Sequence, residues 1–103
     1  MEAVYVLKIK DLRPGMRRVN VTGKIVEIGE AVEVMTRNGP AIVASAILED
    51  DTSRIKLSLW NEQISQVKVG DTVKIENGYV STFRGQKQLN VGFYGKITVI
   101  KEE

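Results

Sequence analysis

With 103 residues the chain can bury one hydrophobic core but not two, so we expect a single domain over residues 1–103, with its core at about residues 15–100. The sequence has no cysteine and no histidine, which excludes disulfide bonds, thiolate chemistry, imidazole catalysis and zinc sites built from these residues. The formal net charge is only +2, but basic residues predominate between positions 8 and 24, which allows a polarised surface for a polyanion. Neither a signal peptide nor an apolar segment of the ~20 residues that span a bilayer is present, so we expect a cytoplasmic protein.

Alternating apolar and polar residues predict strands along most of the chain, the first at residues 17–29. Before it, residues 4–16 allow one short helical turn that ends at Pro14-Gly15. Within the first strand the apolar parity changes after Ile25 to Val26 and Ile28, which predicts a bulge or a strong bend near residues 23–26. Such a bend is typical of strands that curve around a small barrel.

The following segments complete an all-β pattern. Asn38-Gly39 predicts a hairpin turn, and Pro40 directly after it favours a loop or a sheet edge. We expect strands at 41–48 and 54–60, a short helix at 61–71 with Ile64 and Val67 on one face, and strands at 71–80 and 88–100. Five strands with a helix between the third and the fourth fit a five-stranded Greek-key barrel better than a sandwich, which needs about seven strands.

The sequence offers little for catalysis. Glu49, Asp50 and Asp51 form an acidic cluster, but consecutive carboxylates point in different directions, so we interpret them as a solvated turn rather than a metal site. No histidine is present to activate a serine or a threonine, and residues 70–74 lack the glycine spacing of a phosphate loop. We therefore predict no enzymatic activity, no catalytic residue, no metal and no cofactor.

The single tryptophan is the strongest indication of a binding surface. In the strand RIKLSLW (residues 54–60), Ile55, Leu57 and Leu59 share one face, so Trp60 falls on the other face with Lys56 and Ser58. An exposed aromatic ring beside a cation can stack on a nucleic-acid base while the cation meets a phosphate. The alternative is structural, because a tryptophan at a strand end often covers a barrel mouth or packs under the following helix.

Two further aromatic residues flank a basic connection. Strict alternation from Val73 and Ile75 would place Tyr79 in the core, but a bulge at Asn77-Gly78 would turn it to the outer face. Phe83 lies among Ser, Thr, Arg and Gly residues, where an apolar ring has little structural reason to be. Candidate phosphate contacts accompany the three rings: Arg37, Lys56, Arg84 and Lys87.

Residues 48–60 (LEDDTSRIKLSLW) and 67–92 (VKVGDTVKIENGYVSTFRGQKQLNVG), with LRPGMRRVNVTGKIVE and TRNG before them, resemble crenarchaeal single-stranded DNA-binding proteins related to replication protein A. The resemblance covers roughly residues 7–96. It implies one OB-fold and sequence-tolerant binding of single-stranded DNA in replication, repair and recombination, with bases stacked on Trp60, Tyr79 and Phe83. The family commonly has tryptophan where this chain has Tyr79, which keeps a stacking face on a smaller ring.

Other assignments stay open at this point. Stacking does not distinguish RNA from DNA, and exposed aromatic residues also occur at protein interfaces, so the barrel could instead be an assembly module. As partners we expect single-stranded DNA, with RNA and replication or repair proteins as further candidates, and no membrane. We expect a monomer rather than an obligate oligomer, associated with the nucleoid.

Overall fold

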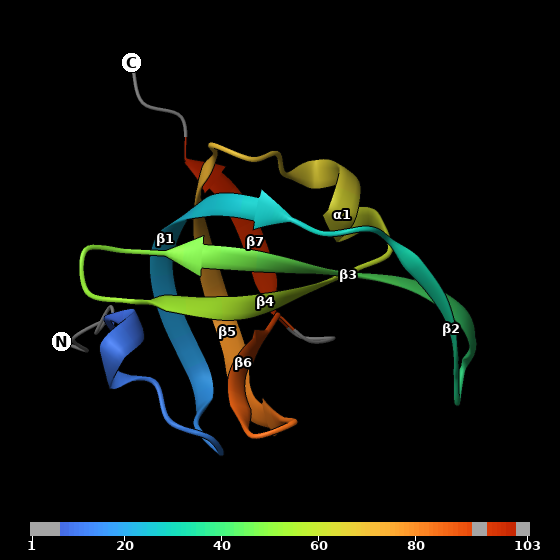
Figure 1. The fold of residues 1–103 in the computed structure, drawn as a ribbon, viewed down its shortest axis with the longest axis horizontal. Helices are drawn as coiled ribbons and strands as arrows, with labels where there is room; N and C mark the ends of the chain where they lie inside the picture. Colours follow the sequence, from blue (N-terminus) through green and yellow to red (C-terminus); the bar gives the residue numbers. More distant parts are fainter. Residues whose placement is uncertain (1–6, 92–94, 101–103) are drawn as a thin grey trace, which may run out of the picture.

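The computed structural model describes residues 7–91 and 95–100, which form a β-barrel with a projecting hairpin (Figure 1). In chain order the elements are η1 (Ile9–Asp11), β1 (Arg17–Ile28), β2 (Val32–Thr36), β3 (Gly39–Glu49), β4 (Arg54–Trp60), α1 (Glu62–Gln66), β5 (Thr72–Phe83), β6 (Gln86–Asn90) and β7 (Lys96–Ile100). Residues 92–94 of the expected last strand lie outside the described residues. Among the residues described, no helix is both long and apolar enough to cross a membrane.

Five strands close the barrel in the order β1–β3–β4–β6–β5, and β5 pairs back onto β1. All of these pairs are antiparallel except β4 with β6, which is parallel. β6 pairs with the second half of β5, and β7 pairs antiparallel with its first half. The predicted five-stranded barrel is confirmed, with α1 between its third and fourth strands, although the last strand is divided into β6 and β7.

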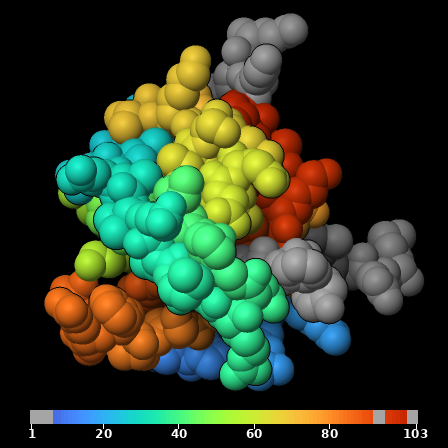
Figure 2. All heavy atoms as spheres, turned by 90° about the vertical axis from the view of Figure 1, so that its right-hand side faces the viewer, coloured from blue at the N-terminus to red at the C-terminus, as the bar shows by residue number. Residues whose placement is uncertain are grey.

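The hairpin predicted at Asn38-Gly39 is confirmed, and it is longer than the turn alone indicates. β2 pairs only with β3, from Val32 opposite Val43 to Thr36 opposite Gly39, so the two strands form an arm outside the ring. Gly39 has φ +111°, which favours glycine there. Figure 2 shows this arm, coloured cyan to green, standing towards the viewer between α1 (yellow) and the β5–β6 turn (orange).

Inward-facing aliphatic side chains fill the barrel. They are Val19, Val21 and Ile25 of β1, Ala46 and Leu48 of β3, Ile55, Leu57 and Leu59 of β4, Val73, Ile75 and Val80 of β5, and Leu89 and Val91. Ile9 and Leu12 are also buried, so the core takes in residues before position 15, and Val67 after α1 joins it with Ile64 packed alongside. The predicted bulge in β1 is confirmed, since the pairing with β3 shifts between Ile25 and Glu27.

Asp50 in the β3–β4 turn is partly buried and has a structural role. Its carboxylate accepts hydrogen bonds from the backbone N–H of Ile9 (2.8 Å), from both the N–H and the hydroxyl of Thr52, and from the N–H of Ser53. Burial opposes ionisation, but these hydrogen bonds outweigh it and lower the pKa of Asp50 to about 2. The turn thereby holds η1 against the barrel, and Lys8 adds an ion pair to Asp51 at 2.9 Å.

Candidate nucleic-acid interface

One side of the sheet carries aromatic rings around a polar centre. We call it the outer face; it consists of Arg54, Lys56, Ser58 and Trp60 of β4, Gln86, Gln88 and Asn90 of β6, and Tyr79, Ser81 and Phe83 of β5. The strand register aligns these residues in rows, because residues opposite each other in neighbouring strands share a face. One row runs from Ser58 through Asn90 to Tyr79, and the next from Lys56 through Gln88 to Ser81.

Trp60 stands on the outer face, as the alternation in β4 predicts. It pairs with Val43 of β3, is partly exposed, and lies outside the cluster of buried residues that forms the core. The backbone after it turns sharply, since Asn61 has φ +52°, and the first turn of α1 then folds back so that the Gln63 side chain accepts the N–H of Trp60 at 2.9 Å. Helix α1 thus fixes the backbone of Trp60 without covering the ring completely.

The bulge that decides the direction of Tyr79 is present in β5. Val21 pairs with Ile75 and Val19 with Gly78, so an advance of two positions in β1 matches an advance of three positions in β5. Asn77 lies in this longer segment of β5 and has φ +58°. After this bulge Gly78 and Val80 face the core. Tyr79 consequently faces outward, with 44% of its surface exposed.

Phe83 ends β5 at the far end of the outer face and is 55% exposed. The Arg84 guanidinium lies 5.3 Å from the centre of its ring, within the range of a cation–π interaction. Arg84 itself has φ +52° in the tight β5–β6 turn. A residue with a positive φ angle therefore lies within two positions of each ring: Asn61 after Trp60, Asn77 before Tyr79 and Arg84 after Phe83.

The polar side chains between the rings hold one another in place. Gln88 donates through Nε2 to the Ser58 hydroxyl and to Asn90 Oδ1 (3.2 Å), and Asn90 donates through Nδ2 to the Ser81 hydroxyl at 3.0 Å. Ser58 and Asn90 are almost fully buried by these neighbours. We call these side chains the polar floor. It lies between Tyr79 on β5 and strand β4, which are two strand spacings or ~10 Å apart.

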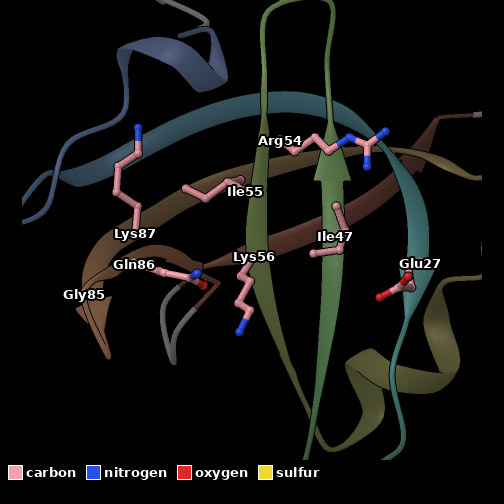
Figure 3. A pocket seen from close by; sticks show the side chains of 8 residues that line it. All are labelled: Glu27, Ile47, Arg54, Ile55, Lys56, Gly85, Gln86 and Lys87. Atoms are coloured by element: carbon pink, nitrogen blue, oxygen red, sulfur yellow. The ribbon is translucent and has the colours of Figure 1, made fainter.

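The structure brings some of the predicted cations to this surface and separates one from it. Lys56 is exposed in the middle of the outer face, Arg84 adjoins Phe83, and Arg37 occupies the tip of the β2–β3 arm. Lys87 instead faces the opposite side of β6, where its ammonium donates to the carbonyl of Leu12 at 2.9 Å. Figure 3 shows the side chains of Lys87 and Lys56 pointing in opposite directions.

Arg17 is a cation of this surface that the sequence pattern does not single out. It is exposed and pairs directly with Tyr79 across β1 and β5, so the two side chains share the outer face. The sequence shows that Arg17 belongs to the basic segment between positions 8 and 24. The pairing with Tyr79 depends on the closure of β1 onto β5, which residue spacing does not reveal.

Two hollows open at the two ends of this surface. The first, of about 640 Å³, is lined by Arg54, Ile55, Lys56, Gly85, Gln86 and Lys87 with Glu27 and Ile47 (Figure 3). The second, of about 580 Å³, lies between the β2–β3 arm, Trp60, Tyr79 and the start of α1. In the described part of the chain, no three His, Cys, Asp or Glu side chains come together in a way that could hold a metal ion.

Known proteins with the same barrel include archaeal replication proteins. The chain is 42% identical over 96 residues to the single-stranded DNA binding protein Ssb of Saccharolobus solfataricus, covering 93% of this chain and 65% of that relative's length. Among solved structures, the OB domain of a Thermoplasma acidophilum protein superposes with a TM-score of 0.82 at 31% identity, covering 94% of this chain and 88% of that one. The second OB-fold domain of replication protein A from Methanococcus maripaludis gives 0.77 at 27% identity, with 94% and 96% covered.

The sequence also matches a family model described as single-stranded DNA binding protein Ssb-like, OB fold, over residues 12–99. This match takes in β1 to β6 and nearly all of β7. The chain therefore belongs to the family of Ssb-like single-stranded DNA-binding proteins with an OB fold.

Proposed function

We propose that this domain binds single-stranded DNA across its outer face, with bases stacked on Trp60, Tyr79 and Phe83. The observation that carries the proposal is that the bulge at Asn77 directs Tyr79 onto the same exposed surface as the other two rings. Membership of the Ssb-like family and the likeness to archaeal Ssb support the same ligand. We assign the domain to DNA replication, with repair and recombination as further processes that expose single strands.

Affinity in this arrangement comes from ring faces and cations rather than from base edges. Each base stacked on an aromatic ring contributes about 1–3 kcal/mol, and every base offers a π-face, so binding tolerates sequence. The polar floor side chains are oriented by hydrogen bonds to one another, so they offer ring and base faces a fixed polar surface. Arg17, Lys56, Arg84 and Arg37 would neutralise phosphates along the path.

Titration with an oligonucleotide of thymidine tests the proposal directly, because Trp60 is the sole tryptophan and reports contact at one known place. We expect its fluorescence to be quenched up to a stoichiometric end point. With three or four phosphates neutralised, the logarithm of affinity should fall against the logarithm of salt with a slope of about −2 to −3.

The same titration separates the rival assignments. Absence of quenching together with a concentration-dependent dimer would contradict DNA binding and favour a protein interface at the rings. Affinity that does not change with salt would contradict the assigned phosphate contacts. A parallel titration with an oligonucleotide of uridine measures the preference for DNA over RNA, which the ring faces alone do not set.

A further inference from the structure

We propose that the hollow beside Trp60 receives one base by its Watson–Crick edge and prefers cytosine to thymine, with the Glu62 carboxylate accepting the cytosine amino group. This inference rests on the proposed function, since it concerns one base of a strand already stacked on the outer face. It adds a local preference to a surface that is otherwise tolerant of sequence.

The hollow has the composition of a base site. Trp60 and Tyr79 supply ring faces, and Thr36, Pro40 and Ala41 of the arm form the wall away from the barrel. Its volume of about 580 Å³ leaves room for a nucleotide with water. The arm holds its own shape at this point, because the Thr36 hydroxyl donates to the carbonyl of Gly39 at 2.6 Å and accepts the N–H of Asn38.

Two side-chain amides at the base of α1 have a fixed orientation. The Asn61 Oδ1 atom accepts the N–H of Ile42 at 3.0 Å, and the Gln63 Oε1 atom accepts the N–H of Trp60 at 2.9 Å. Both residues line the hollow, and in each the oxygen is bound to the backbone. The amino half of each amide is therefore the half left to meet a ligand, as a hydrogen-bond donor.

Glu62 lies between these two amides in sequence and, among the described residues, is the one charged residue that lines the hollow. A carboxylate accepts hydrogen bonds and donates none, and the described part of the chain places no cation in the lining of this hollow to attract a phosphate. A phosphate group would be repelled here and would lie towards Arg17 or Lys56 instead. What the carboxylate accepts from a nucleotide is an amino group, as in the pairing of Glu or Asp with N4 of cytosine.

One acceptor beside two donors complements the edge of cytosine. Cytosine offers one donor, the N4 amino group, and two acceptors, N3 and O2. Thymine presents the oxygen O4 where cytosine has the amino group, so its edge would set an acceptor against the carboxylate. Glu62 is exposed in the free protein, and a thymine base placed against it would displace water from the carboxylate without returning a hydrogen bond.

Deoxycytidine and deoxyuridine oligonucleotides of equal length provide the test, because they differ only in the groups at C4 and N3 and not in a methyl group. We expect wild-type protein to bind the cytidine oligomer about five- to tenfold more tightly, measured by Trp60 fluorescence at a pH where cytosine is neutral. Glu62→Gln should reduce that ratio to near one. The control Glu33→Gln removes an equal charge from an exposed position on β2 that does not line the hollow, and it should keep the wild-type ratio.

Equal affinity for the two oligomers in wild-type protein, or a ratio that Glu62→Gln leaves unchanged, would overturn the inference while leaving DNA binding in place. An equal loss of preference in Glu33→Gln would also overturn it, because the effect would then be one of net charge. Failure of both oligomers to bind would instead contradict the proposed function.

Discussion

Replacing Trp60, Tyr79 and Phe83 together by alanine is expected to abolish measurable binding of single-stranded DNA while the barrel stays folded. Each stacked base contributes about 1–3 kcal/mol, so each single replacement should weaken affinity by about 5- to 150-fold. The three effects need not add, because neighbouring contacts on one strand are coupled. Binding of a fluorescently labelled oligonucleotide, followed by anisotropy, measures the loss without relying on Trp60.

Stability separates a stacking surface from a structural one. Tyr79 and Phe83 are 44% and 55% exposed, so their truncation should cost little free energy of unfolding, and that of partly exposed Trp60 somewhat more. Leu57→Ala is the matched control, because Leu57 is fully buried on the inner side of β4 and its truncation should cost about 2–5 kcal/mol. A loss of that size in Trp60→Ala, with unchanged affinity in the protein that remains folded, would show that the ring is structural.

Gly78→Ala is expected to destabilise the protein by about 1–3 kcal/mol and to weaken DNA binding through Tyr79. A Cβ atom on Gly78 would lie 2.9 Å from the carbonyl oxygen of Asn90 and 3.2 Å from Cγ2 of Ile75. The first contact is with backbone of β6, which cannot move away without disturbing the pair between Tyr79 and Asn90. Chemical denaturation and the anisotropy titration measure the two effects.

Thr82→Ala is the control for this replacement, since Thr82 is exposed on the same strand and its truncation removes no packing in the core. It should leave the free energy of unfolding within about 0.5 kcal/mol of wild type. If Gly78→Ala proves as stable as Thr82→Ala, the backbone of β6 can move away from a Cβ atom at position 78, and the packing account of Gly78 is wrong.

Local pattern was sufficient to predict most of the barrel. Period-two alternation in residues 54–60 depends only on neighbouring side chains, and it assigned Ile55, Leu57 and Leu59 to the core and Trp60 to the outer face. The bulge in β1 was also visible as a change of apolar parity. At Asn77-Gly78, however, the pattern permitted both directions for Tyr79, and the pairing of β5 with β1 decides between them.

Long-range register explains what the sequence left unsettled. Lys87 is two positions from Leu89, which faces the core, and its ammonium binds a carbonyl 75 residues away in the chain, so its basic character alone did not reveal this contact. Arg17 became part of the outer face only through its pairing with Tyr79. Asp50 likewise gained its structural role from η1, whose Ile9 N–H approaches it over 41 positions of sequence.

Mapping the bound strand by NMR tests the central claim most directly. On addition of a thymidine oligonucleotide, backbone amide shifts should change at Trp60, at residues 79–83, along β6 and in the β2–β3 arm. Amides of Lys74 and Thr98, which pair with each other on the β5–β7 side of the barrel, should not move. Shifts concentrated around Lys74 and Thr98, with residues 56–60 and 79–83 unchanged, would contradict binding across the outer face.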